Sequence, residues 1–201
     1  MKIITVSRQF YSGGRDFARE LAKTLGFDFY DKAIITEIAQ KTELDEKFVK
    51  DNLEKGFSAY PTHFGRGSYY SPIINTAAIN VAVAQREIIK SIAERGNAVI
   101  VGRGADVILK EYNTLNLFVY RDIEERIQRY RLSFNDDDSD RRIKNKLLAV
   151  DRERARCREM TTDTKWGDKD CYHLMINLTG LNDRSVVKAV AQYATEWFDE
   201  K

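Results

Sequence analysis

Short apolar stretches recur along the chain, separated by segments whose apolar residues repeat every three or four positions. The stretches cover residues 3–7, 27–30, 98–102, 115–120 and 174–178. Brief runs of this kind, rich in β-branched residues, predict buried strands, and the three- and four-residue spacing predicts amphipathic helices. Strands that alternate with helices are typical of a parallel sheet covered on both faces. We therefore expect an α/β fold with a five-stranded parallel sheet flanked by helices.

The helical pattern is clearest directly after the first strand. Apolar residues recur at helical spacing up to Leu25, and Gly26 ends the helix, as glycine often does. Further helices are predicted over residues 33–54, 75–95, 123–132, 143–157 and 185–198.

Composition narrows the class of protein. The 201 residues suit a single domain with a sizeable core. Lys and Arg number 33 against 31 acidic residues, a balance that argues against nucleic acid or an anionic membrane as the main partner. No apolar run approaches the ~20 residues needed to span a bilayer. Two cysteines and two histidines argue against a structural zinc site, and a reduced, cytoplasmic setting is expected. A homo-oligomer is compatible with this composition.

The connection between the first strand and the first helix is the leading candidate for chemistry. It reads Ser7-Arg8-Gln9-Phe10-Tyr11-Ser12-Gly13-Gly14-Arg15-Asp16. A strand that turns through glycines into a helix is the layout of a phosphate-binding loop, because the free amides of the first helical turn point at the anion. A plain strand-to-helix turn, with Gly13 and Gly14 serving only the tight bend, is the alternative.

The loop departs from the usual phosphate-loop pattern G-x-x-x-x-G-K-[ST]. In one register Arg8 and Gly13 take the two glycine positions, Gly14 replaces the lysine and Arg15 replaces the metal-binding hydroxyl. Shifting by one residue places Arg15 at the lysine and Asp16 at the metal ligand. In either register we expect Arg15 to supply the positive charge, since arginine can grip phosphate in a bidentate way.

Two other strands are followed by residues suited to binding. Ligands of open parallel sheets bind beyond the carboxyl ends of the strands. Arg103, after the third strand, could hold a phosphate there or be an ordinary surface arginine. Tyr30 and Asp31 close the second strand, where Asp31 could contact a substrate or cap the helix that starts at Ala33.

Two segments interrupt the alternation of strands and helices. The first, about 32–70, holds aromatic residues that could stack on a base or pack beneath a long loop: Tyr60, Phe64, Tyr69 and Tyr70. The second, about 126–169, is rich in arginine. Arg129, Arg152 and Arg156 are candidates to close over phosphates as a lid, although Asp151 and Glu153 are also compatible with a solvated, salt-bridged helix.

Several motifs, in this order, carry a resemblance to a known family. They are Ile4-Thr5-Val6-Ser7-Arg8-Gln9-Phe10, Ser12-Gly13-Gly14-Arg15, Phe29-Tyr30-Asp31-Lys32, Val101-Gly102-Arg103-Gly104-Ala105-Asp106, the segment 151–156, Trp166-Gly167-Asp168 and Asp170-Cys171-Tyr172-His173-Leu174-Met175-Ile176-Asn177. Over essentially the whole chain the sequence resembles the cytidylate kinase-like proteins, which are divergent relatives of cytidylate kinase among the P-loop nucleoside monophosphate kinases. Compared with true cytidylate kinases, Gly104 replaces an Asp, and Asp31-Lys32-Ala33 stands where Asp-Thr-Gly is usual.

The resemblance implies a single kinase-like domain. Its core would be residues 1–31, 75–125 and 170–201, with an acceptor-binding insertion at about 32–74 and a lid at about 126–169. It also implies phosphoryl transfer from ATP, with Mg²⁺, to a nucleoside monophosphate such as CMP or to a similar acceptor. Residues 7, 8 and 12–16 would hold the donor, and Tyr30, Asp31 and Arg103 the acceptor. A nucleotide sensor without turnover is the main alternative, and an RNA-binding protein is a third.

Overall fold

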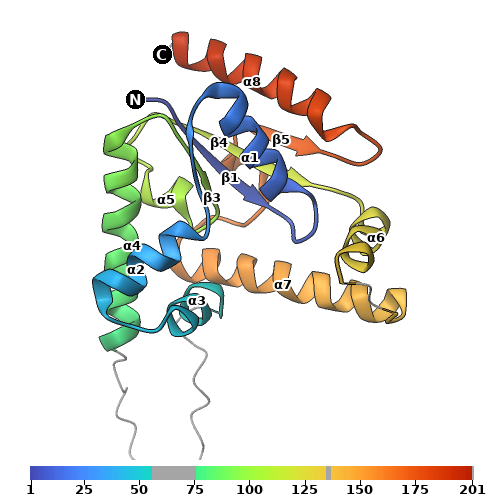
Figure 1. Ribbon diagram of the computed structural model, residues 1–201, viewed down its shortest axis with the longest axis horizontal. Helices are drawn as coiled ribbons and strands as arrows, with labels where there is room; N and C mark the ends of the chain where they lie inside the picture. The colour runs from blue at the N-terminus through green and yellow to red at the C-terminus, as the bar shows by residue number, and fades with distance from the viewer. Residues whose placement is uncertain (56–75, 135–136, 201) are drawn as a thin grey trace, which may run out of the picture.

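The computed structural model describes residues 1–55, 76–134 and 137–200, and its centre is a five-stranded sheet (Figure 1). The strands are β1 (Ile3–Arg8), β2 (Asp28–Tyr30), β3 (Ala98–Val101), β4 (Thr114–Tyr120) and β5 (Leu174–Asn177). All pairings are parallel, and the order across the sheet is β2-β3-β1-β4-β5. The predicted fold class is confirmed.

Helices follow most strands and cover the sheet. They are α1 (Gly14–Leu25), α2 (Ala33–Thr42), α3 (Glu46–Lys55), α4 (Thr76–Arg95), α5 (Ala105–Ile108), α6 (Ile123–Phe134), α7 (Asp140–Thr161) and α8 (Asp183–Asp199). A short 3₁₀ turn, η1 (Lys169–Cys171), precedes β5. In Figure 1, α8 and α7 lie at opposite sides of the sheet, and both chain ends lie near α8.

Side chains of the central strands point alternately to the two faces of the sheet, and each face has its own hydrophobic cluster. Ile4 and Val6 of β1 pack with α1 and α8, whereas Ile3 packs with α2, α4 and α5. The two-residue period of a strand sends neighbouring side chains to opposite faces, so a strand with helices on both sides buries side chains on both faces. Ile3, Ile4 and Val6 are accordingly all buried, and so is Thr5, whose hydroxyl donates to Asn116 Oδ1 of β4 at 2.7 Å.

A third, smaller cluster joins α6 to α7. Ile127 of α6 packs with Ile143 and Leu147 of α7, and Phe10 and Tyr11 of the β1–α1 loop lie against them. The two arginine-rich helices are therefore attached to the loop at the carboxyl end of β1.

The helix predicted over residues 33–54 is two helices. Glu43 adopts a left-handed φ of 55° and ends α2, and the carboxylate of Asp45 accepts hydrogen bonds from the amides of Lys47 and Phe48. A side chain that caps new amides in this way starts a second helix. The other predicted bounds agree with the structure to within a few residues, and α5 was not predicted.

The aromatic candidates Tyr60, Phe64, Tyr69 and Tyr70 lie outside the described residues. Among the helices of the described ranges, none has the length and apolar character needed to cross a membrane.

Candidate functional site at the carboxyl edge of the sheet

The connection from β1 to α1 is a tight turn held by its own polar groups. Ser12 donates from its amide and its hydroxyl to the carbonyl of Gln9, at 3.3 and 2.9 Å, and its hydroxyl accepts from the Gly14 amide at 3.2 Å. Tyr11 and Gly13 have φ angles of 60° and 89°. Position 13 suits glycine because a left-handed φ is strained for most side chains.

Free amides remain at the start of α1. Among the described residues, the amides of Gly13, Arg15 and Asp16 have no hydrogen-bond acceptor. The first amides of a helix lack intrahelical partners, and the helix dipole places roughly half a positive charge there. This end of α1 is therefore suited to an anion.

Arg8 brings a partly buried cation to the same edge. Its guanidinium passes so close to Gly102, after β3, that a Cβ on Gly102 would overlap Arg8 Nη1. Burial lowers the pKa of Arg8 to about 9, and the neighbouring cations Arg154, Arg103 and Arg15 lower it further, whereas Asp31 acts in the opposite direction. Several arginines thus lie close enough to Arg8 at this edge for their charges to act on it.

Asp31 is the carboxylate at the centre of these cations. Its side chain is 6% exposed, accepts a hydrogen bond from Arg15 Nε and lies 4.0 Å from Arg8 Nη2. The expectation that Asp31 caps the following helix is wrong, since Lys32 occupies the N-cap position and no side chain caps the helix. The arginines draw the Asp31 carboxylate toward the sheet edge, away from the amides of α2.

The turn after β3 has an unusual backbone. Gly102, Arg103 and Gly104 all have left-handed φ angles, of 71°, 60° and 61°. The Arg103 carbonyl accepts from Gln85 Nε2 of α4 at 3.1 Å, which fixes the turn against the helix. An arginine in this conformation costs energy, and strain of this kind is concentrated at functional sites.

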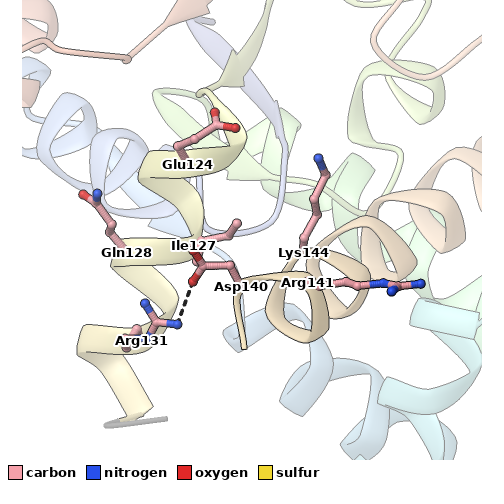
Figure 2. Close-up of a pocket in the computed structure, with 7 residues that line it drawn as sticks. All are labelled: Glu124, Ile127, Gln128, Arg131, Asp140, Arg141 and Lys144. Carbon is pink, nitrogen blue, oxygen red and sulfur yellow. Dashed lines mark hydrogen bonds and ion pairs between the residues drawn. The ribbon is translucent and has the colours of Figure 1, made fainter. Parts of the chain in front are cut away.

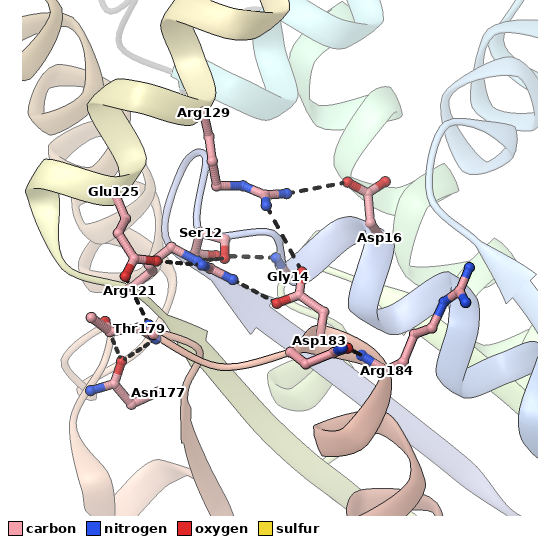
Figure 3. A network of polar contacts seen from close by, with 12 residues as sticks. Ser12, Gly14, Asp16, Arg121, Glu125, Arg129, Asn177, Thr179, Asp183 and Arg184 are labelled. Atoms are coloured by element: carbon pink, nitrogen blue, oxygen red, sulfur yellow. Dashed lines mark hydrogen bonds and ion pairs between the residues drawn. The ribbon is translucent and has the colours of Figure 1, made fainter.

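Arg129 of α6 lies over the loop (Figure 3). Its guanidinium is 3.8 Å from the Asp16 carboxylate and 3.9 Å from that of Asp183. A Cβ on Gly13 would be 3.2 Å from Arg129 Nη2. Of the predicted lid arginines, Arg129 is the one that the structure places beside the loop.

Arg121 is a site residue that sequence reasoning missed. It is 7% exposed and follows β4, where it donates to the Ser12 carbonyl at 2.9 Å, to Asp183 at 2.7 Å and to Glu125 at 2.5 Å (Figure 3). The hydrogen bond from Arg121 also lowers the pKa of Glu125. Its position at the carboxyl end of a predicted strand was the available signal.

On α7, one side faces the loop and the other faces solvent. Asp151 accepts from the Phe10 amide at 2.8 Å and from buried Arg126, and Arg154 donates to the Arg8 carbonyl at 2.8 Å. Arg152 is exposed, as is Arg156, which pairs with Glu153. The structure does not bring these two predicted lid residues to the loop.

Two further predicted residues lie apart from the arginine cluster. Tyr30 packs with the α2–α4 cluster, and the guanidinium of Arg95 lies 5.9 Å from the centre of its ring. Asp16, the metal candidate, is 61% exposed and pairs with Arg19 and Arg129. Within the described ranges, no three His, Cys, Asp or Glu residues form a group that could hold a metal ion.

A separate recess lies between α6 and the start of α7, with a volume of about 380 Å³ (Figure 2). Arg131 and Asp140 pair there at 2.7 Å. The residues that line the recess carry charges of both signs: Glu124, Ile127, Gln128, Arg131, Asp140, Arg141 and Lys144. Because charges of both signs line the recess, it favours neither an anionic nor a cationic ligand. The carboxyl edge of the sheet therefore remains the candidate site.

Comparison with known families agrees with this geometry. The model of the cytidylate kinase-like family matches residues 3–180, from β1 through the turn after β5. The chain belongs to the cytidylate kinase-like family. The resemblance seen in the motifs is thereby confirmed. A comparison with curated proteins finds no match.

Solved structures support the same kinase-like fold. An uncharacterized protein from Eubacterium ventriosum is similar with a TM-score of 0.70 and 23% identity, over 97% of this chain and 98% of that one. A shikimate kinase from Bacteroides thetaiotaomicron gives 0.57 and 15% over 98% of each chain. The shikimate kinase from Acinetobacter baumannii, solved with shikimate, gives 0.54 and 15% over 98% and 94%. Identities this low establish the fold alone.

Proposed function

We propose that this family member is an ATP-dependent phosphotransferase whose acceptor is a nucleoside monophosphate or a similar small phosphorylated molecule, with CMP the first to test. The observation that carries the proposal is the gathering of arginines at the end of β1. Arg15, Arg103 and Arg154 act electrostatically on Arg8 there, with the Asp31 carboxylate among them and the Asp151 carboxylate 3.8 Å from Arg154. A polyphosphate supplies negative charge that is complementary to this cluster.

The residues present fit the phosphates of ATP. The free amides at the start of α1 can cradle oxygens, and the Arg129 guanidinium lies close to Gly13 beside them. Arg15 and Arg129 lie on either side of that turn and would neutralise charge that develops during transfer. Phosphoryl transfer depends mainly on positioning and on such charge stabilisation.

The site would also have to hold Mg²⁺. ATP would bring the ion with its phosphates, and Asp16, in the first turn of α1, is the protein carboxylate proposed to face it. Bound Mg²⁺ neutralises phosphate charge during transfer.

Arg103 and Asp31 are proposed to face the acceptor. Both follow strands on the β2–β3 side of β1, whereas Arg121 and Arg129 approach the loop from the β4 side. The two sets would therefore hold acceptor and donor on opposite sides of the loop. We also propose the division into core, insertion and lid at residues 32–74 and 126–169.

A sensor that binds nucleotide without turnover is the second candidate. The observation that favours it is that Arg15, the residue expected to replace the lysine, is already bound to Asp31. In a sensor this pairing would persist when the nucleotide binds.

One assay separates the two candidates. ADP release from ATP and Mg²⁺ is measured with CMP, dCMP, UMP, AMP and GMP, while calorimetry follows ATP binding. We expect turnover with at least one monophosphate. ATP binding without turnover on any of them would leave the sensor, and no ATP binding would reject both.

A further inference from the structure

Trp166 and Gly167 belong to the family motifs, and the proposed phosphate chemistry gives them no role. The Trp166 ring meets Phe118 of β4 edge to face, with 5.1 Å between ring centres. A Cβ on Gly167 would lie 3.3 Å from the Phe118 ring. Since Leu117 and Val119 point into the α1–α8 cluster, Phe118 and this covering segment lie on the opposite face of the sheet.

A pocket of about 260 Å³ opens between that segment and the strands. Its lining residues are Gln9, Phe118, Tyr120, Trp166, Gly167 and Met175. Phe118 and Met175 are register partners on β4 and β5, and the Gln9 amide donates to the Val119 carbonyl at 3.0 Å. The pocket thus lies at the carboxyl edge of the sheet, directly beside the loop.

The lining combines aromatic walls with a small number of neutral polar groups. Gln9 Oε1 accepts a hydrogen bond from the Arg121 amide at 3.2 Å. The side-chain nitrogen of Gln9 is a hydrogen-bond donor that has no acceptor among the described residues. The Tyr120 hydroxyl likewise has no hydrogen-bond partner in the described part of the chain. Apolar and aromatic walls with few polar groups are typical of small-molecule sites, and no charged side chain lines this one.

From this arrangement we infer that the pocket takes the nucleobase of a nucleotide whose phosphates lie on the β1–α1 loop. Gln9 belongs to both parts, because its carbonyl accepts from Ser12 within the loop while its side chain lines the pocket. A molecule that joins an uncharged planar ring to phosphates fits the two neighbouring sites. Aromatic side chains stack on any base, and the free amide and hydroxyl can pair with the edge of a base. The inference deepens the proposed function and rests on it for the phosphate half.

Trp166 itself reports on occupancy of the pocket. Trp197 of α8, the other tryptophan, packs against His173 at 4.4 Å between ring centres, so Trp197→Phe leaves Trp166 as the single reporter. This variant is titrated with ATP, ADP, adenosine and inorganic tripolyphosphate, and calorimetry measures binding in parallel. The three ligands with a ring should change Trp166 emission, and tripolyphosphate should bind without changing it. Unchanged emission at saturating nucleotide, or an equal change with tripolyphosphate, would overturn the inference.

Two substitutions test the walls of the pocket. Tyr120→Ala and Trp166→Leu should each weaken the binding of adenosine and ATP about fivefold or more, with Trp166→Phe close to the parent protein. Tripolyphosphate binding should stay within about twofold, since neither residue lies in the loop. An equal loss for tripolyphosphate would show a merely structural role and refute the pocket. Adenosine binding at Trp166 without tripolyphosphate binding would support the pocket and refute the phosphate site.

Discussion

Gly14 lies so close to Arg8 that a Cβ added to Gly14 would be 2.6 Å from the Cβ of Arg8. The same atom would be 3.0 Å from the Cβ of Val119. In the register that places Arg8 and Gly13 at the two glycines, the usual phosphate loop has glycine at position 8 and lysine at position 14. In that register this chain has the cation on β1 and the glycine on α1. We propose that the bulk of Arg8 is the reason that position 14 is a glycine.

The first prediction tests this exchange. Gly14→Ala would ordinarily favour a helix, but here it should lower the free energy of unfolding by about 1–3 kcal/mol because the methyl group collides with Arg8. Gly14→Lys alone should do the same. The double variant Arg8→Gly/Gly14→Lys should recover most of the loss and bind tripolyphosphate. Urea unfolding and calorimetry measure both effects. If the two substitutions are simply additive, the coupling between these positions is refuted.

We expect Arg8 to lower the free energy of unfolding of the protein and to strengthen its binding of phosphates. Its guanidinium is partly buried among other arginines, so Arg8→Met should raise the free energy of unfolding by about 0.5–2 kcal/mol and weaken tripolyphosphate binding. Arg19→Met, a change on the exposed side of α1, is the control and should alter neither. A less stable Arg8→Met protein would show that Asp31 compensates the charge fully.

The pH dependence of this difference has a defined sign. Folding lowers the pKa of Arg8 from its ordinary value to about 9, so the penalty for its charge is complete below pH 9. Above pH 9 the folded protein loses the proton before the unfolded chain does, and the penalty falls as the pH rises. The stability advantage of Arg8→Met should therefore be smaller at pH 10 than at pH 8 in urea unfolding. An advantage that grows over this interval would contradict the assignment.

The sequence was sufficient for the fold because strand and helix patterns are local. Five short apolar runs predicted the strands. The helical segments between these runs predicted that the strands are parallel. The break between α2 and α3 was not predicted, since it depends on a left-handed Glu43 and on Asp45 capping the next helix. Such capping competes with a continuous helix through single side chains, and periodicity does not detect it.

The site was predictable in part. Strand ends located the loop, Asp31 and Arg103 at one edge, because topology alone brings strand ends together. Which arginines face the loop is a matter of tertiary contacts. Arg121 was overlooked at a strand end. On α7, the loop-facing Arg154 was passed over in favour of Arg152 and Arg156, whose helix side faces solvent.

Asp31→Asn should separate stability from anion binding. The substitution removes the carboxylate that Arg15 and Arg8 face, so the free energy of unfolding should fall by about 1–3 kcal/mol. The freed cations should bind tripolyphosphate about three- to tenfold more tightly, since the competing negative charge is gone. Asp28→Asn, at the exposed start of β2, is the matched control. Weaker tripolyphosphate binding in calorimetry would mean that Asp31 orients the arginines for the anion.

The Arg126–Asp151 pair should be structural. Arg126 is 2% exposed and donates to the Phe10 carbonyl as well as to Asp151. Arg126→Met removes the cation that donates to the buried Asp151 carboxylate and leaves only Arg154, 3.8 Å away, among the cations paired with it in the described residues. The cost should be about 3–5 kcal/mol, and Arg126→Met/Asp151→Leu should recover much of it. Exposed Arg152→Met should stay within about 0.5 kcal/mol of the parent. Urea unfolding measures these differences. A small loss in the free energy of unfolding of Arg126→Met would show that the pair is dispensable.

Arg103→Ala should raise the KM for the acceptor about ten- to a hundredfold and leave ATP affinity nearly unchanged. Arg103 lies in the turn that follows β3, on the side of β1 away from β4, and its backbone carbonyl accepts from Gln85. The substitution therefore removes a guanidinium without moving the turn that carries it. Steady-state ADP release gives the KM and calorimetry gives the ATP affinity, with exposed Arg86→Ala as the control. A loss of ATP affinity at constant acceptor KM would show that Arg103 contacts the donor rather than the acceptor. ATP binding without turnover on any monophosphate would contradict the kinase function and support the sensor.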